Sequence, residues 1–93
     1  MNTKKNLPIE ETFAIAVKNH KENNFQVAEK LYKEVLKQNP DHFESVYYLG
    51  NLLAQTNQFS LAKSMLHKAT QIKPDNAMAH NNLGNVLKNL EKY

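Results

Sequence analysis

The chain reads VAEKLYKEVLKQNPD over residues 27–41 and LAKSMLHKATQIKPD over residues 61–75. These stretches align with a spacing of 34 residues, and the same spacing relates Phe25 to Phe59, Ala28 to Ala62, Pro40 to Pro74, and Gly50 to Gly84. A fixed period of this length indicates a repeated pair of helices. One such pair cannot bury its apolar face alone, so stacked copies share a continuous core. Because stacking also makes a concave surface, the period favours binding over catalysis.

The composition fits a single helical domain. The chain has 93 residues, of which 41% are hydrophobic, and this length allows one domain with a modest core. Leu, Lys, Ala, Glu and Asn are abundant, which suits helices better than strands. The absence of cysteine excludes disulfides and thiolate metal sites. No apolar run approaches the ~18 residues of a membrane span, and no secretory signal is recognisable, so we expect a cytoplasmic protein without membrane contacts.

The charge pattern is evidence against nucleic-acid binding. The net charge is +3, and all 12 basic residues are lysine. Arginine supplies the bidentate contacts to bases and phosphates on which nucleic-acid recognition relies. The lysines are also scattered among 9 acidic residues. We therefore interpret the charges as a solvated helical surface and expect no nucleic-acid partner.

Apolar residues recur at helical spacing in five segments. The first segment places Ile9, Phe13 and Val17 at i, i+4 and i+8, which is typical of an amphipathic helix. Turns are expected at Asn23-Asn24 and at Thr56-Asn57. Five helices with short connections predict an antiparallel, all-α array. The expected helices span about residues 9–22, 25–38, 42–55, 59–72 and 76–90.

Two prolines mark where the second and fourth helices end. Pro40 and Pro74 each push the residue before them out of the helical region of backbone space. Asp41 and Asp75 follow at equivalent points of the repeat. An aspartate just before a helix accepts hydrogen bonds from the first backbone N–H groups, so we expect Asp41 and Asp75 to cap the third and fifth helices.

Two glycines lie inside expected helices, in register with the repeat. Gly50 and Gly84 each cost about 1 kcal/mol relative to alanine at such a position. Their shared register suggests a shared structural need, namely the close approach of a neighbouring helix where any Cβ would clash. We expect Ala62 to face Gly50, and Ala16 to face Ala28 in the first repeat.

These residues resemble those of the tetratricopeptide repeat family. Its pattern is W-x2-L-G-x2-Y, then A-x3-F-x2-A, then P, within 34 residues. The second repeat matches at Val46, Leu49-Gly50, Leu53, Ala62, Leu66, Ala69 and Pro74, and the first at Ile15-Ala16, Ala28, Tyr32, Val35 and Pro40. Thr12 and Asn19 are polar where the family prefers large apolar groups, which a solvent-facing first helix would explain.

The resemblance implies a right-handed solenoid of about two and a half repeats. The first repeat would span residues 9–42, the second residues 43–76, and the half repeat residues 77–93. Residues 1–8 would form a frayed N-terminus.

In this family the first helix of each pair lines a concave groove. The resemblance therefore implies a protein or peptide partner in that groove. Aromatic rings there can hold apolar side chains of a peptide, while carboxamides can bond both the donors and the acceptors of an extended backbone. Carried over by position, the partner-binding residues are Phe13, Val17, Tyr47, Tyr48, Asn51, Asn81, Asn82 and Asn85.

Two subsets of the family bear on the partner. The stretch AHNNLGNVLKNL at residues 79–90 resembles repeats of O-linked N-acetylglucosamine transferases, whose groove asparagines hold substrate peptides. Only Asn82 matches that asparagine position, since its equivalents are Ala14 and Tyr48. A second subset clamps the C-terminal carboxylate of chaperones with Lys, Asn and Arg. This chain lacks the cations of that clamp, because the matching positions are Phe13, Val17, Tyr48, Met78 and Asn82.

No residue pattern points to catalysis or to a bound cofactor. The histidines fall in different segments, and none pairs with another at the i, i+4 spacing of a helical metal site. The serines have no nucleophile-elbow context, and no glycine loop is suited to cradling a phosphate. We therefore expect a protein that is not an enzyme and uses no cofactor or metal.

The last expected helix carries an apolar strip. Leu83, Gly84 and Leu87 would normally meet a following helix, and an uncovered strip favours association. We therefore expect either a fragment of a longer protein or a homodimer that buries Leu83 and Leu87. Three functions stay open: an independent interaction module, the N-terminal arm of a glycosyl-, sulfo- or methyltransferase, and a self-associating scaffold.

Overall fold

Five α-helices follow one another in a computed structural model of the protein, which describes residues 8–92. Each expected helix is present, and every boundary lies within one residue of the predicted position. The expectation of a frayed N-terminus concerns residues 1–8, of which 1–7 lie outside the described residues. The helices are α1 (Ile9–Lys21), α2 (Phe25–Gln38), α3 (Phe43–Gln55), α4 (Phe59–Ile72) and α5 (Ala77–Glu91).

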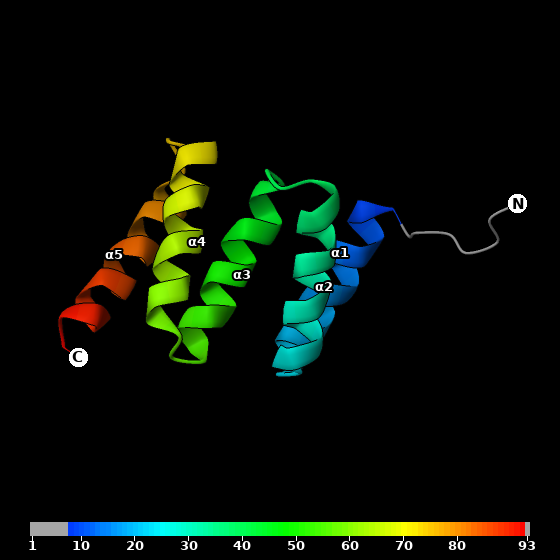
Figure 1. The fold of residues 1–93 in the computed structure, drawn as a ribbon, viewed down its shortest axis with the longest axis horizontal. Coiled ribbons are helices and arrows are strands. Elements are labelled where there is room, and N and C mark those ends of the chain that lie inside the picture. The colour runs from blue at the N-terminus through cyan, green and yellow to red at the C-terminus, as the bar shows by residue number, and fades with distance from the viewer. Residues whose placement is uncertain (1–7, 93) are drawn as a thin grey trace, which may run out of the picture.

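The helices stack as a row of antiparallel neighbours, as Figure 1 shows. The most extensive contacts join α1 to α2, α3 to α4 and α4 to α5. In addition, α1 touches α3 and α3 touches α5, whereas α2 and α4 make no such contact within residues 8–92. Helices on the inner side of a bend lie closer together than those on its outer side. The odd-numbered helices therefore line the concave face, and α2 and α4 form the convex one.

The turns inside the two helix pairs use the same backbone device. Asn23 and Asn57 have φ angles of 65° and 64°, in the left-handed region that asparagine tolerates better than most residues. Both residues were predicted to lie in turns from the sequence. Because the two asparagines are one repeat apart, the chain reverses in the same way after α1 and after α3.

The caps of α3 and α5 differ from the prediction by one residue. His42 caps α3, where its Nδ1 accepts a hydrogen bond from the Ser45 backbone N–H at 3.2 Å. Asn76 caps α5, where its Oδ1 accepts from the Ala79 N–H at 2.9 Å. The prediction of Asp41 and Asp75 as caps was wrong. After each proline the chain makes one further turn. The backbone N–H groups of His42 and Asn76 close these turns by bonding to carbonyl groups three residues earlier. Each aspartate therefore lies one residue before the cap.

Substitutions at residues 75 and 76 test this assignment. We expect Asn76→Ala to lower the free energy of unfolding by about 0.5–2 kcal/mol, because the Ala79 N–H loses its acceptor. Asp75→Ala is the matched control and should change it by less than ~0.5 kcal/mol. Urea titrations followed by circular dichroism measure both values, and equal losses in the two variants would contradict the assignment of the cap.

The core runs along the whole stack. Its largest fully buried side chains include Tyr32 and Leu66, which lie on α2 and α4. Ala16, Ala28 and Ala62 have no exposed surface, in keeping with their predicted role in close helix packing. None of the helices within residues 8–92 is long and apolar enough to span a membrane.

Thr12 departs from the expectation of a solvent-facing first helix. Thr12 is only 7% exposed. Asn19 on the same helix is half-buried, and its side-chain amide donates a hydrogen bond to the backbone carbonyl of Ile15. The buried face of α1 therefore includes Thr12, since α1 packs against both α2 and α3. The sequence misplaced this residue because polarity alone does not show which face a neighbour covers.

The two repeat-related glycines have different surroundings. A Cβ built on Gly50 would stand 2.8 Å from Cγ of Leu66 and 3.4 Å from its backbone N. The close approach predicted for Gly50 is present, but the residue that requires it is Leu66 rather than Ala62. A Cβ on Gly84 would meet no described atom within 4 Å, so the close packing predicted for Gly84 has no partner among residues 8–92.

Candidate functional site

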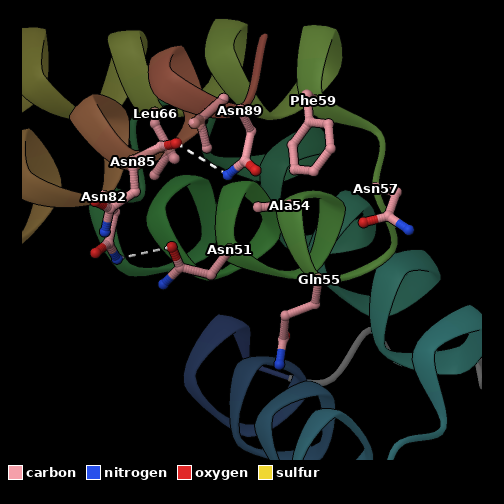
Figure 2. A pocket seen from close by; sticks show the side chains of 10 residues that line it. Asn51, Ala54, Gln55, Asn57, Phe59, Leu66, Asn82, Asn85 and Asn89 are labelled. Carbon is pink, nitrogen blue, oxygen red and sulfur yellow. Dashed lines mark hydrogen bonds between the residues drawn. The ribbon is translucent and has the colours of Figure 1, made fainter. Parts of the chain in front are cut away.

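The larger of two neighbouring cavities lies between α3 and α5 and has a volume of about 470 Å³. Its wall includes six carboxamide side chains, and its floor is apolar. Figure 2 shows Asn51 of α3 beside Asn82 of α5, whereas Gln55 points away from them toward α1 and Asn57 lies in the α3–α4 turn. The lining residues are Asn51, Ala54, Gln55, Asn57, Phe59, Leu66, Asn82, Asn85, Val86 and Asn89.

A second cavity of about 360 Å³ continues the first toward α1. The two cavities share Asn51 and Gln55, both on α3. Together they form one groove across α1, α3 and α5, which we call the concave groove. The smaller cavity is lined by Val17, His20, Lys21, Asn23, Tyr48, Asn51 and Gln55.

The groove contains five of the eight residues that the sequence assigned to it. Asn51, Asn82 and Asn85 line the larger cavity, and Val17 and Tyr48 join Asn51 in the smaller one. The other three line neither cavity: Tyr47 is only 8% exposed, Phe13 is half-buried and Asn81 is exposed.

Asn82 ties α5 to α3 through two hydrogen bonds. Its Nδ2 group donates to Tyr47 Oη at 2.9 Å and to Asn51 Oδ1 at 2.9 Å, and Figure 2 shows the second of these. Both amide hydrogens of Asn82 are therefore used inside the protein. The oxygen of Asn82 and the nitrogen of Asn51 have no hydrogen-bond partner among residues 8–92, so they are available to a ligand.

Aromatic rings form a packed cluster beneath the α1 end of the groove. The Phe13 ring lies 5.5 Å from Tyr48 and 6.1 Å from Tyr32, measured between centroids. Tyr48 also lies 6.2 Å from Tyr32 and 5.6 Å from Tyr47. Such edge and tilted contacts add to the stabilisation from burial. Phe13 and Tyr47 therefore support the groove from below, while Tyr48 both supports it and lines it.

His20 joins three helices at the smaller cavity. Its Nδ1 lies 2.8 Å from Tyr32 Oη on α2, and its Nε2 lies 2.5 Å from Gln55 Oε1 on α3. With Nε2 donating to Gln55, Nδ1 accepts from the Tyr32 hydroxyl. Both ring nitrogens are thus engaged, and His20 holds Gln55 in place on the groove wall.

The groove predicted from the sequence omitted several lining residues, although helical spacing could have indicated them. His20 lies three residues after Val17, Gln55 four after Asn51, and Asn89 four after Asn85. Residues three and four apart share a helix face. Extending the predicted groove by one turn along each helix would therefore have found all three.

Charge is distributed unevenly along the groove. The lining of the larger cavity contains no ionisable side chain, whereas the smaller one contains Lys21 and His20. Lys21 makes no ion pair within residues 8–92. No group of three or more metal-ligating side chains gathers among the described residues. The chemistry of the groove is thus hydrogen bonding by neutral amides, with one cation at the α1 end.

Burial raises the pKa of the Tyr32 hydroxyl well above its ordinary value of 10.0, and the nearby Tyr48 adds to the shift. Folding thus favours the protonated phenol. This contribution to stability is complete below pH 10.0 and is lost as the pH rises from there toward the folded-state pKa. We expect the free energy of unfolding to fall above pH 10.0, and to fall less steeply in Tyr32→Phe. Urea titrations below and above that pH measure this, and identical pH slopes would contradict it.

Solved structures with the same fold include a mutant O-GlcNAc transferase from Thermobaculum terrenum. It is 30% identical, with a TM-score of 0.81 over 85% of this chain, and the match covers 15% of the transferase chain. A crystal structure of a tetratricopeptide repeat domain protein from Salinibacter ruber is 18% identical, with a TM-score of 0.69, covering 92% of this chain and 94% of its own. A solution structure of such a protein from the same organism is also 18% identical, with a TM-score of 0.68 and coverages of 96% and 89%.

The odd-numbered helices, the positive-φ asparagines and the buried alanines all recur with the repeat, as the sequence pattern requires. The family model for the tetratricopeptide repeat matches residues 20–89. Proteins built from this repeat generally mediate protein–protein interactions, and they are usually non-catalytic scaffolds. By both the match and the geometry, the chain belongs to the tetratricopeptide repeat family.

Proposed function

We propose that the concave groove binds a segment of a partner protein in extended conformation. The supporting observation is a continuous groove across α1, α3 and α5 with an amide-rich wall and an apolar floor. An extended peptide exposes its backbone N–H and C=O groups, and carboxamides complement both. The apolar floor gives a side chain of the peptide a place to be buried. The helices α1, α3 and α5 each pack against neighbouring helices, and a groove that is already formed requires less ordering on binding.

The test uses variants that block the groove without removing the core. Tyr47 and Tyr48 are left unchanged, because Tyr47 is buried and Tyr48 packs on Tyr32, so substitutions there would disturb the core. Asn85 is exposed and lines the larger cavity. The bulky side chain of Asn85→Trp should therefore block the opening of that cavity. Lys63→Trp is the matched control, because Lys63 is exposed on α4 and lines neither cavity.

The probe is a nine-residue peptide selected from a random phage library against the wild-type chain. We expect Asn85→Trp to weaken its binding at least about tenfold, because packed pocket contacts dominate such interfaces. Lys63→Trp should bind like the wild type. Fluorescence anisotropy titrations measure both affinities. Equal affinity of the two variants would show that the groove is not the binding surface.

A second candidate function is that of a partner-recognition arm within a larger transferase. It is favoured by the 30% identity and the TM-score of 0.81 to the O-GlcNAc transferase, of whose chain this one covers 15%. The genomic reading frame beyond residue 93 tests it. Further repeats followed by an α/β catalytic region would support this candidate, and an immediate stop codon would contradict it.

Self-association is a third candidate, suggested by the apolar strip of α5. Leu87 is 39% exposed, and Leu83 beside it is half-buried. Two such strips could cover each other in a homodimer. Light scattering over a range of concentrations tests this, with Leu87→Lys as the variant expected to abolish dimerisation. A wild-type chain that stays monomeric at high concentration would exclude the homodimer.

A further inference from the structure

The outer face of α5 lies at the end of the row of helices, as Figure 1 shows. Four residues follow one another on this face at i, i+4, i+7 and i+11, so they form one stripe: His80, Gly84, Leu87 and Glu91. We call them the end stripe. Three of them are exposed, and a Cβ built on Gly84 meets no described atom within 4 Å. No helix among residues 8–92 therefore covers the end stripe.

The preceding repeat shows how the gap at such a glycine is filled. Gly50 is the counterpart of Gly84, and Leu66 of α4 lies against it, with its Cγ 2.8 Å from the Cβ position. The gap therefore accepts a leucine from an antiparallel helix. Leu87 is a leucine of this kind, because it is 39% exposed and lies one turn after Gly84 on the same stripe.

Two copies of α5 are complementary when they pack antiparallel. Leu87 of each copy then faces Gly84 of the other. Gly84 lies four residues after His80, and Leu87 lies four residues before Glu91. The same alignment consequently places Glu91 of each copy beside His80 of the other. Both contacts occur twice about a two-fold axis, as in an isologous interface.

His80 favours a second copy over a purely apolar helix as the occupant. Its counterpart in the preceding repeat is Val46, which has no exposed surface, and a helix placed like α4 would bury His80 in the same way. A buried imidazole needs hydrogen-bond partners. The Nε2–H of His80 donates to the Pro74 carbonyl at 2.7 Å, which leaves Nδ1. The carboxylate of Glu91 from a second copy accepts from Nδ1 when the ring is protonated.

We propose that two copies of this chain associate through their end stripes in antiparallel orientation, with Leu87 of each copy against Gly84 of the other. Glu91 lies beside the second copy's His80 at both ends of the contact. This inference rests on the self-association candidate above and adds its surface, direction and register. It leaves the concave groove free, since no residue of the end stripe lines either cavity.

The size of the stripe sets the expected strength of the dimer. From His80 to Glu91 the helix rises about 16 Å. A contact between two helices of this length buries less than the roughly 1,200–2,000 Å² of a stable interface. We therefore expect a dimer that dissociates on dilution, with a dissociation constant of about 50–500 µM.

Sedimentation equilibrium of the whole chain at about pH 6, which favours protonated imidazole, tests the surface. We expect Gly84→Leu and Leu87→Lys each to weaken the dimer at least about tenfold, because both remove the central packing contact. Gly84→Leu gains helix propensity in the monomer, so its loss of dimer is not a failure to fold. Met78→Lys is the matched control, because Met78 is 66% exposed and lies on the opposite side of α5. It should dimerise like the wild type.

A reversal of charge tests the register. His80→Glu places carboxylates together at both ends of the contact and should weaken the dimer about three- to tenfold. Adding Glu91→Lys to this variant should restore the wild-type affinity. Residues 80 and 91 are three turns apart on one helix, so restoration arises only between copies. A double variant as weak as His80→Glu alone would overturn the register.

The outcomes separate this inference from the candidate on which it rests. A wild-type chain that stays monomeric up to about 1 mM, well above the expected dissociation constant, refutes self-association and this inference together. A dimer that is unchanged in Gly84→Leu, or that Met78→Lys weakens as much as Leu87→Lys, refutes the end stripe alone.

Discussion

Gly50→Leu is expected to unfold at a melting temperature at least ~10 °C below that of the wild type. The new side chain must occupy the space of Leu66, whose Cγ and Cδ2 lie 2.8 and 2.9 Å from the Cβ position. Leu66 is fully buried and cannot move aside without disturbing the core. Overpacking of this kind costs about 1–3 kcal/mol or more, and each 1 kcal/mol shifts the midpoint by about 4–8 °C in a domain of this size.

Gly84→Leu is the matched control at the same repeat position. A Cβ at residue 84 meets no described atom within 4 Å, and leucine has a better helix propensity than glycine by about 0.8 kcal/mol. We expect its melting temperature to equal or exceed that of the wild type. Thermal unfolding followed by circular dichroism compares the two variants. Equal losses in both would mean that the mid-helix glycines are sensitive for a reason other than Leu66.

Tyr32→Ala is the substitution with the largest expected loss of stability. Tyr32 has no exposed surface, and its ring lies within 6.2 Å of Phe13, His20 and Tyr48, measured between centroids. Its hydroxyl also bonds His20, at 2.8 Å. Truncation of a buried aromatic side chain costs about 3–5 kcal/mol, a large part of the 5–15 kcal/mol that stabilises a typical domain.

The control for Tyr32→Ala is a substitution at an exposed apolar residue, where truncation removes little buried surface. Leu61 is 56% exposed on α4, so Leu61→Ala should change the free energy of unfolding by less than ~0.5 kcal/mol. Urea titrations give both values. A loss below about 1 kcal/mol for Tyr32→Ala would contradict the assignment of Tyr32 to the centre of the first repeat.

The helices and turns were predictable because their signals are local. Proline ends α2 and α4, asparagine takes the left-handed position of two turns, and apolar spacing places each helix. The caps were missed by one residue because their position depends on how the chain turns after each proline. The two glycines differ because equivalent places in a repeat need not have equivalent neighbours: Gly50 has Leu66 of the following helix, whereas no described helix follows α5.

The groove was predictable in position but not in detail. Family resemblance placed Asn51, Asn82 and Asn85 on the concave face, and the structure brings all three to one cavity. The sequence did not show that the side-chain amide of Asn82 donates hydrogen bonds to Tyr47 and Asn51, which are 35 and 31 residues away. Such pairings depend on how successive repeats pack, which no single helix determines.

Amide NMR spectra recorded during titration with the selected nine-residue peptide test the central claim most directly. The claim is that the concave groove, and not the convex face, binds the partner. We expect the largest shifts at the side-chain amides of Asn51, Asn82 and Asn85 and at neighbouring backbone amides of α1, α3 and α5, with α2 and the outer side of α4 unchanged. Shifts concentrated on α2 and α4, with the three side-chain amides unmoved, would contradict the account.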